Sequence, residues 1–485
     1  MTEASGVPVA ELAAAIPSGG RVAVVNGPPG RDVPGRDVRV LDVVHDSRQV
    51  GPGALFACLV GEHHDGHRFA EGAVAAGAVA LLVERELPVA VPQIVVDDSR
   101  RALGHLAAAV HDHPSAALTV IGITGTNGKT TSAHLLAAAL TGAGLGVGVL
   151  GTLSGARTTP EAPDLQRRLA GFRDDGLGAV VMEVSSHALA FHRVDGTQFD
   201  VAVFTNLGRD HLDLHHSIEG YFRAKARLFT PGLAAMGVVN RDDPYGRLLL
   251  DVGDIPMRTF GLDDAVDATS TADGHRFRWR GREVVVPIGG DVNLPNSLAV
   301  LATCEALDLD LDAAVAGLAA AGPIPGRFEL VGADLDLGFS VVVDYAHTPD
   351  GLEVLLASAR RVLTDGRVIV VVGCGGDRDR DKRRHMGAAA AEGADVVVIT
   401  SDNPRSESPE AIIHEMLDGV APRYRDQLVV EADRRAAIGR ALDEARRGDV
   451  VVIAGKGHET TQTIGTTAHP FDDRVVAREL LEGRS

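Results

Sequence analysis

The sequence predicts an α/β protein of three domains. Its 485 residues are too many for one hydrophobic core, because single cores stop growing at about 250–300 residues. Short apolar segments alternate with helix-length stretches along most of the chain, which is typical of parallel sheets covered by helices. A polar linker at 111–115 and a Pro/Gly-rich hinge at 322–326 interrupt this rhythm. We therefore expect domains at 1–113, 114–326 and 327–485.

The first of these segments has the elements of a smaller α/β domain. Its apolar runs are short and are separated by Ala-rich stretches of helical length. We expect strands at 38–40, 55–59, 79–83 and 94–96, and helices at 69–78 and 101–110.

The second segment opens with the most informative motif of the chain. A buried strand at 118–123 runs into Gly125-Thr-Asn-Gly-Lys-Thr130 and then into a helical pattern. Glycines let backbone N–H groups approach phosphate oxygens, and a helix N-terminus adds partial positive charge. Lys129 can reach the β- and γ-phosphates, and the Thr130 hydroxyl can bind Mg²⁺. The motif predicts ATP or GTP binding on a P-loop ATPase-like parallel sheet, although its glycines are closer together than usual. The alternative is a Gly-rich turn with a solvated lysine.

Charge and composition argue against several classes of protein. The formal net charge of −19 disfavours a nucleic-acid partner, which would require a basic face. Cys58, Cys304 and Cys374 lack metal-ligand spacing and predict reduced thiols. The first residues lack the pattern of a signal peptide, and no apolar run is long enough to span a bilayer. We expect a cytoplasmic monomer that binds small molecules, with no nucleic-acid partner and no membrane insertion.

Polar residues follow two predicted central strands of the second domain. Glu183 ends the strand that begins at 179, and His211 lies in the segment after the strand at 201–204. Ligands collect at the carboxyl ends of parallel strands, so both side chains should face the phosphate loop. With Thr130 they could bind Mg²⁺, although Mg²⁺ prefers oxygen to imidazole. The alternatives are a helix-capping carboxylate and a core histidine. Lys225 lies in a helical stretch whose pattern alone indicates a solvated surface lysine.

The third segment predicts a Rossmann-like doubly wound sheet, with strands at 341–343, 368–372, 396–399, 428–430 and 450–453. Asp402-Asn-Pro-Arg405 follows one of these strands. Pro404 stiffens the turn, and Arg405 can make a bidentate contact with a carboxylate. The pattern alone favours an ordinary Asx-Pro turn with a solvated arginine.

Seven motifs occur in the same order as in the Mur ligase family of peptidoglycan synthesis, and with them nearly the whole chain resembles that family. Within the family, the chain is most similar to the UDP-N-acetylmuramoyl-tripeptide synthetases. The motifs are GTNGKTT at 125–131, EVSSHAL at 183–189, TNLGRDHLD at 205–213, DYAHTP at 344–349, GCGGDRD at 373–379, DNPR at 402–405 and GKGHE at 455–459.

The resemblance implies an ATP-dependent amide ligase that adds meso-2,6-diaminopimelate to the D-Glu γ-carboxylate of UDP-MurNAc-L-Ala-D-Glu through an acyl phosphate. ATP would be the co-substrate and Mg²⁺ the cofactor. The first domain would bind the UDP-sugar, the second ATP and the third the amino acid. In this family Asp-Asn-Pro-Arg accompanies diaminopimelate, whose second carboxylate can pair with the arginine, whereas lysine would leave the guanidinium unpaired.

The resemblance also implies site residues. UDP-sugar contacts are implied at Ser47, Glu62, His63, His64, Thr158, Thr159, Ser185 and Arg193. ATP contacts are implied at Gly125, Thr126, Asn127, Gly128, Lys129, Thr130, Thr131, Asn296, Arg327, Asp344 and His347. Amino-acid contacts are implied at Arg378, Asp402, Asn403, Pro404, Arg405, Gly455 and Glu459. The catalytic set is Lys129, Glu183, His211 and Lys225; Mg²⁺ would bind Thr130, Glu183, His211 and Lys225, which the resemblance makes a carbamylated lysine.

Two positions depart from the family pattern. Arg157 stands where relatives often have Asn, and Phe191 stands where some have Gln, which puts single UDP-sugar contacts in doubt. The nearest alternative function is a lysine-adding or folylpolyglutamate-type ligase. An alternative from another class is a regulatory nucleotide-binding module without ligase activity.

Overall fold

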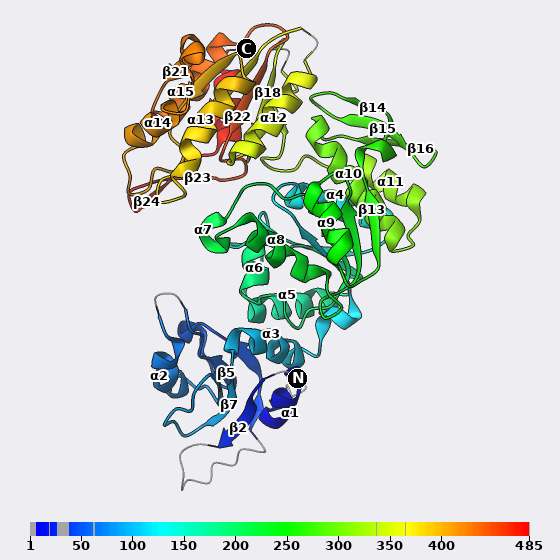
Figure 1. Ribbon diagram of the computed structural model, residues 1–485, viewed down its shortest axis with the longest axis vertical. Helices are drawn as coiled ribbons and strands as arrows, with labels where there is room; N and C mark the ends of the chain where they lie inside the picture. The colour runs from blue at the N-terminus through cyan, green and yellow to red at the C-terminus, as the bar shows by residue number, and fades with distance from the viewer. Residues whose placement is uncertain are drawn as a thin grey trace.

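Each of three groups of apolar strands forms its own sheet and its own lobe in the computed structural model (Figure 1). The structure describes residues 6–18, 20–26, 38–61, 64–335, 337–363 and 365–484. The three lobes follow one another along the longest axis, from the blue N-terminal lobe through the green central lobe to the yellow and red C-terminal lobe. The expected three-domain α/β fold is confirmed. Within the described ranges no helix combines the length and apolarity needed to cross a bilayer.

The N-terminal lobe is built on a five-stranded sheet whose order is β2-β7-β6-β5-β4. Its strands are β2 (Val22–Asn26), β4 (Asp42–Val44), β5 (Ala54–Ala57), β6 (Ala80–Val83) and β7 (Pro92–Val96). β2 runs antiparallel to β7, and the other pairs are parallel. The helices are α1 (Val9–Ala14), α2 (Ala70–Ala75) and α3 (Ser99–Val110), and β1 (Val7–Pro8) pairs with β3 (Arg39–Val40).

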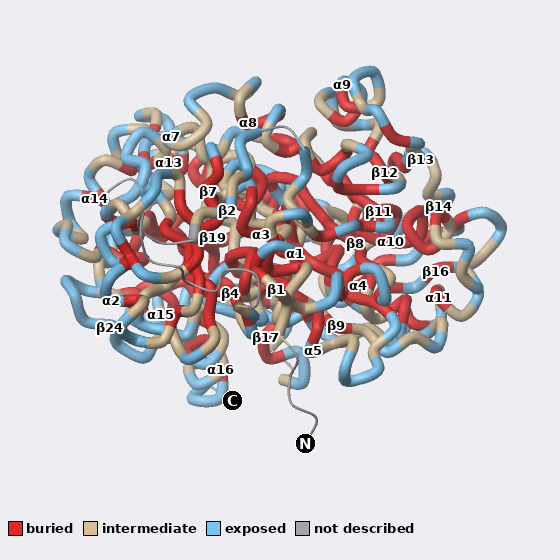
Figure 2. Tube along the Cα trace, turned by 90° about the horizontal axis from the view of Figure 1, so that it is seen from below, coloured by how far each residue is buried: buried red, intermediate tan, exposed pale blue. Residues whose placement is uncertain are grey.

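The central lobe has a six-stranded, wholly parallel sheet with the order β13-β12-β11-β8-β10-β9. Its strands are β8 (Thr119–Thr124), β9 (Val147–Leu150), β10 (Ala179–Glu183), β11 (Phe199–Phe204), β12 (Ala234–Asn240) and β13 (Met257–Phe260). Nearly every residue of β8, β10 and β11 is buried, as the red tube of these strands shows for β8 and β11 in Figure 2. Continuous apolar strands of this kind are typical of a parallel sheet covered on both faces.

Helices cover both faces of the central sheet. One core includes α4 (Lys129–Gly142), α10 (Leu294–Ala306) and α11 (Leu311–Ala319). The other includes α5 (Ala162–Asp174), α6 (Ser186–Ala190), α8 (Ile218–Ala226) and α9 (Pro244–Val252). The central lobe also has a three-stranded antiparallel sheet of β14 (Val266–Ser270), β15 (His275–Trp279) and β16 (Arg282–Val286), and alternate side chains of β15 and β16 join the first core.

The C-terminal lobe has a six-stranded sheet with the order β17-β18-β22-β19-β20-β21, in which only β17 is antiparallel to its neighbour among the described strands. The strands are β17 (Glu329–Val331), β18 (Ser340–Asp344), β19 (Val368–Val372), β20 (Val396–Ile399), β21 (Leu428–Val430) and β22 (Val450–Ala454). Its helices are α12 (Pro349–Arg361), α13 (Asp381–Gly393), α14 (Pro409–Leu417), α15 (Arg434–Glu444) and α16 (Asp473–Glu482), and β23 (Thr461–Ile464) pairs with β24 (Thr467–Pro470).

A buried ion pair ties two helices of this lobe to the ends of its strands. Arg434 and Asp473 are both 0% exposed, and two nitrogens of the guanidinium donate to the carboxylate at 2.8 and 2.7 Å. The same guanidinium donates to the carbonyl oxygens of Ser401, after β20, and Ala454, at the end of β22. Arg434 therefore holds together two strand ends that carry predicted amino-acid contacts.

We expect Asp473→Asn to destabilise the C-terminal lobe by about 3–5 kcal/mol, because it leaves the Arg434 charge buried and unpaired. Calorimetric unfolding measures the effect. The control is Glu479→Gln, which breaks the neighbouring Arg435–Glu479 pair between the same two helices; both partners are about half exposed, so the loss should stay below about 1 kcal/mol. Equal losses in the two variants would contradict the role given to the buried pair.

Candidate active site

The order of the central sheet brings three predicted groups together. β8 lies between β10 and β11, with Glu183 opposite Ile123 and Phe204 opposite Thr124. The phosphate loop leaves the carboxyl end of β8. Glu183 therefore stands on one side of the loop, and the segment that follows Phe204 stands on the other, as expected for ligand-binding residues at strand ends.

The loop needs its two glycines because it is pressed against neighbouring segments. Gly125 and Gly128 have φ of 154° and 85°. A Cβ at Gly125 would overlap the Thr205 hydroxyl, and one at Gly128 would overlap Asn296 Oδ1. Asn206 holds the loop from the side, since its Oδ1 accepts from the N–H of residue 127 at 2.9 Å. The backbone N–H groups are thereby arranged at the N-terminus of α4, where a phosphate binds well.

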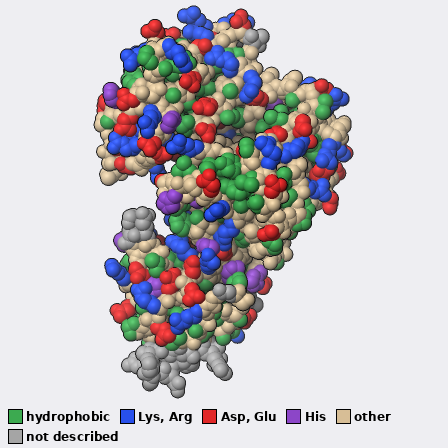
Figure 3. Space-filling view, in the orientation of Figure 1, with side chains coloured by type: hydrophobic (Ala, Val, Ile, Leu, Met, Phe, Trp, Pro, Cys, Tyr) green, Lys and Arg blue, Asp and Glu red, His purple; other side chains and the backbone are tan. Residues whose placement is uncertain are grey.

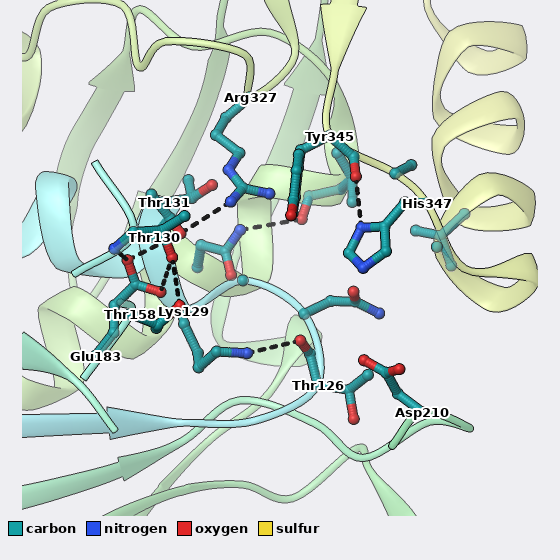
Figure 4. Close-up of a pocket in the computed structure, with 18 of the residues that line it drawn as sticks. Thr126, Lys129, Thr130, Thr131, Thr158, Glu183, Asp210, Arg327, Tyr345 and His347 are labelled. Carbon is teal, nitrogen blue, oxygen red and sulfur yellow. Dashed lines mark hydrogen bonds between the residues drawn. The ribbon is translucent and has the colours of Figure 1, made fainter. Parts of the chain in front are cut away.

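Lys129 and Thr130 are the first two residues of α4. The Lys129 ammonium turns back onto the loop and donates to the Gly125 carbonyl oxygen at 2.7 Å. The Thr130 hydroxyl donates to Glu183 Oε1 at 3.0 Å and accepts from Arg327 Nη2 at 3.0 Å (Figure 4). Two cations, a hydroxyl and a carboxylate thus meet at the start of one helix, which suits a nucleotide phosphate and its counter-ion.

Lys225 is buried, and the interpretation of its helix as a solvated surface pattern is wrong. Its side chain is 1% exposed; the amine donates to the Gly125 carbonyl oxygen at 2.8 Å and lies 4.6 Å from the centre of the Tyr221 ring. Burial, with a further contribution from the nearby charge of Lys129, holds the pKa of Lys225 well below the usual range of a lysine. A neutral amine is a nucleophile, whereas an ammonium is not.

His211 lies in the loop after β11 with its backbone in the left-handed region, at φ 53°. Its Nε2 is 3.3 Å from Asp210 Oδ2, and its ring packs edge-on against His187 with the centroids 4.6 Å apart. Burial lowers the pKa of His211 to about 4, although Asp210 opposes this shift. The imidazole is therefore neutral near pH 7 and keeps a lone pair available for a metal ion.

The donors around the loop fit Mg²⁺ shared with a nucleotide. Among the described residues, no group of three or more His, Cys, Asp or Glu side chains has a metal-binding arrangement. Mg²⁺ commonly binds one or two protein ligands and completes its shell with waters and substrate phosphates. The Thr130 hydroxyl and the Glu183 carboxylate, already in contact, provide such ligands beside the place where a phosphate would lie.

A cavity of about 270 Å³ lies between the central and C-terminal lobes at this point. From the C-terminal side, Arg327 stacks over Tyr345, with its guanidinium carbon 4.5 Å from the ring centre. Asp344 accepts from the N–H groups of Phe328 and Ala346 at 2.8 and 2.7 Å, and burial raises its pKa. Apart from Gly125, the predicted ATP contacts line the cavity; they are Thr126, Asn127, Gly128, Lys129, Thr130, Thr131, Asn296, Arg327, Asp344 and His347. Glu183, His211 and Lys225 line it too.

The predicted UDP-sugar contacts are divided between two places. Thr158 and Ser185 line the cavity just described, whereas Ser47 belongs to the 3-10 turn Ser47–Gln49 of the N-terminal lobe. A second cavity of about 410 Å³ lies between the N-terminal and central lobes. His45 and Asp46 line it from the N-terminal lobe, and Arg157 lines it from the central lobe. Figure 3 shows this face of the molecule hollowed between the N-terminal and C-terminal lobes. Glu62 and His63 lie outside the described residues, and His64 is exposed.

The two remaining predicted UDP-sugar contacts, Thr159 and Arg193, bind other residues of this chain. Thr159 is fully buried; its hydroxyl donates to the Glu183 carbonyl oxygen at 2.9 Å and accepts from the Ser185 N–H at 3.0 Å. Arg193 and the unusual Arg157 share the Glu161 carboxylate, at 2.9 and 2.5 Å. The unusual Phe191 packs against the guanidinium of Arg193, 5.8 Å from its ring centre. Phe191 thus contacts Arg193, a residue that is predicted to bind the UDP-sugar.

The predicted amino-acid contacts meet at the carboxyl edge of the C-terminal sheet. Asn403 Nδ2 donates to Glu459 Oε2 at 2.8 Å, which joins the turn after β20 to the segment after β22. Arg405 has a left-handed backbone, φ 50°, and donates to the Gly376 carbonyl oxygen at 2.7 Å. Arg378 lies in the same loop as Gly376 and is exposed. Among the described residues, this edge is separate from the lining of the nucleotide cavity.

Sequence reasoning missed four residues of the site. Asp210 lines the nucleotide cavity, Asn206 orients the loop, Tyr221 bonds Thr126 through its hydroxyl at 3.2 Å, and Tyr345 supports Arg327. Three of them lie inside the motifs that carry the resemblance. Tyr221 stands four residues before Lys225 in α8, a spacing that puts both side chains on one face of a helix, so that signal was present.

The chain is similar to known proteins along nearly its whole length. Family models match residues 41–111 as "Mur ligase family, catalytic domain", 123–304 as "Mur ligase middle domain" and 326–457 as "Mur ligase, glutamate ligase domain". A Streptomyces avermitilis protein named UDP-N-acetylmuramoyl-L-alanyl-D-glutamate--2,6-diaminopimelate ligase is 43% identical over 99% of this chain and 97% of its own length. A protein of the same name from Gloeobacter violaceus is 46% identical over 92% and 95%.

Solved structures give the same result. A structure titled with that ligase name has a TM-score of 0.67 and 34% identity, covering 94% of this chain and 98% of the other. A MurF structure from Acinetobacter baumannii has a TM-score of 0.69 at 20% identity, covering 99% of each chain, and supports the fold alone. With three family models in order along the sequence and relatives above 40% identity across nearly all of it, the chain belongs to the Mur ligase family.

Proposed function

We propose that this protein is an ATP-dependent ligase that joins 2,6-diaminopimelate to the D-Glu γ-carboxylate of UDP-MurNAc-L-Ala-D-Glu in peptidoglycan precursor synthesis. The observation that carries the proposal is the 43% identity, over 99% of the chain, with a ligase of that name. The nucleotide cavity and the intact Asp402–Arg405 segment support it. We place the reaction in the cytoplasm, where ATP is available, and expect the protein to act as a monomer.

The first chemical step transfers the γ-phosphate of ATP to the D-Glu γ-carboxylate. A phosphate loop accelerates such a transfer by positioning the reactants and by stabilising charge that spreads over the phosphate oxygens. Lys129, the N–H groups at the start of α4 and Arg327 provide that charge stabilisation from two lobes. When bound, Mg²⁺ neutralises phosphate charge, and we assign its ligands to Thr130, Glu183 and His211.

The second step is attack of an amine of diaminopimelate on the acyl phosphate, which collapses to an amide and inorganic phosphate. We assign to Lys225 the carbamylated state that the family resemblance implies. Its burial and its depressed pKa support this assignment, because a neutral amine can add CO₂. The carbamate would bring a negative oxygen ligand beside Lys129. Approach of the lobes would exclude water and protect the acyl phosphate from hydrolysis.

The amino-acid edge has charges that match diaminopimelate. Arg405, directed by the Gly376 carbonyl oxygen, would pair with a carboxylate, and Glu459 would accept from an amine. L-Lysine has no second carboxylate, so it would leave one guanidinium without a partner. We propose the meso isomer from the resemblance.

Purified protein given ATP, Mg²⁺ and UDP-MurNAc-L-Ala-D-Glu should release phosphate only when an amino acid is added. Meso-diaminopimelate should support faster release than LL-diaminopimelate or L-lysine. Mass spectrometry of the product identifies the amide. Equal turnover with L-lysine would favour the lysine-adding alternative, and phosphate release without any amino acid would contradict the ligase.

Lys225→Ala should lower kcat by at least ~100-fold, the scale seen when one group that acts on developing charge is lost. Acetate or propionate should restore part of the rate, because a small carboxylate can occupy the space of the carbamate. Arg223→Ala, which removes an exposed cation two residues earlier on the same helix, is the control and should keep full activity. Full activity of Lys225→Ala would remove this residue from the mechanism.

Arg405→Ala should raise KM for meso-diaminopimelate by about 10–100-fold, because a charge-assisted hydrogen bond contributes about 1.5–3 kcal/mol. The ratio of kcat/KM for diaminopimelate to that for L-lysine should fall by a similar factor. Arg384→Ala, an exposed arginine of α13, is the control. An unchanged ratio in Arg405→Ala would mean that another residue binds the distal carboxylate.

A further inference from the structure

Lys456 is a buried cation to which the proposed mechanism gives no role. Four of the 47 basic residues of the chain are lysines. Lys129 and Lys225 line the nucleotide cavity, and Lys382 donates to the carbonyl oxygen of a residue that lines it, His347, at 3.0 Å. Lys456 is 0% exposed and lies directly after Gly455, at the amino-acid edge. A buried ammonium loses its hydration, so it needs nearby acceptors and opposite charge.

Those acceptors come from both segments that form the edge. Lys456 Nζ donates to the Thr461 carbonyl oxygen at 2.7 Å, to Glu459 Oε2 at 3.1 Å and to Asn403 Oδ1 at 3.3 Å. An ammonium has three donors, so all of them are used. Asn403 Oδ1 also accepts from the Thr463 N–H at 2.9 Å, and its Nδ2 donates to the same Glu459 oxygen. The network fixes the orientation of both side chains.

Of the two carboxylates at this edge, Glu459 keeps an oxygen available for a ligand, whereas the oxygen of Asp402 that makes no hydrogen bond is buried. Both hydrogen bonds to the Glu459 side chain go to Oε2, so Oε1 makes none within the described part of the chain, and the side chain is 34% exposed. Asp402 is 8% exposed, and its Oδ1 is buried without a hydrogen bond, 3.7 Å from Lys456 Nζ. Without the ammonium, these two negative groups would repel each other in a place with little water.

We propose that Lys456 is a positioning residue for amino-acid recognition. It holds Glu459 and Asn403 in place and balances the charge of Asp402 and Glu459, so that Glu459 Oε1 receives one amine of the amino acid. The inference rests on the proposed function, which brings an amino acid to this edge. A guanidinium would not replace it, because its planar fork is larger and cannot direct one nitrogen to three oxygens.

Lys456→Met should raise KM for diaminopimelate by ~100-fold, the scale expected when charge-assisted hydrogen bonds that orient the site are lost. KM for ATP and for UDP-MurNAc-L-Ala-D-Glu should stay within about threefold of the wild-type values, since the proposed sites of both substrates lie outside this edge. Positional isotope exchange in ATP, which reports acyl phosphate formation without an amino acid, should be unchanged. Lys456→Arg should not restore KM, and Lys456→Gln serves as the test if the Met variant does not fold.

A double-mutant cycle separates positioning from a general effect on folding. If Lys456 acts through Glu459, Lys456→Met/Glu459→Gln should bind diaminopimelate little worse than Glu459→Gln alone. Additive losses, or a parallel rise of KM for all three substrates with a lower unfolding temperature, would overturn the proposal. Failure of the wild-type protein to use diaminopimelate would instead refute the proposed function, and the cycle would then be measured with the amino acid that it does use.

Discussion

Two lysines donate to one carbonyl oxygen, that of Gly125, and the arrangement of the nucleotide site depends on this crowding. Two ammonium groups at one buried acceptor repel each other, and little water is present to screen them. Burial lowers the pKa of both amines, and the charge of Lys129 adds to this effect at Lys225, whose pKa lies well below its usual range. A carbamate on Lys225 would reverse the sign of its charge, so that the repulsion from Lys129 becomes an attraction. The Gly125 carbonyl oxygen thus connects Lys129, which we propose binds phosphate, with the proposed anionic ligand on Lys225.

The position of that carbonyl follows from the order of the central sheet. Since β8 lies between β10 and β11, Glu183 and the segment after Phe204 flank the loop that begins at Gly125. Arg327 then reaches Thr130 from the C-terminal side. The nucleotide cavity is therefore shared by two lobes, whereas the amino-acid edge belongs to the C-terminal lobe alone. In the proposed reaction, the amine bound at the edge must reach the acyl phosphate formed in the cavity.

Much of the fold could be predicted because its signals are local. Continuous apolar runs identified β8, β10, β11 and the parallel strands of the C-terminal sheet, and turn residues identified the interruptions between the lobes. β2 was missed, because it is an antiparallel edge strand on which Val22 and Val24 remain partly exposed, so the alternation is weak. Lys225 was misjudged from its helix alone, because neighbouring Arg223 and Arg227 make the segment resemble a solvated face.

The sequence by itself determined the strands, the phosphate loop and the motifs that identify the family, since each is encoded within a few neighbouring residues. Only the tertiary structure decided what surrounds the lysines and carboxylates. Lys225 meets Gly125 across 100 residues of chain, and Arg327 meets Thr130 across 197. The charge state of an amine depends on its solvation and on the charges near it in space. Those neighbours come from separate strands and lobes, and no local pattern contains them.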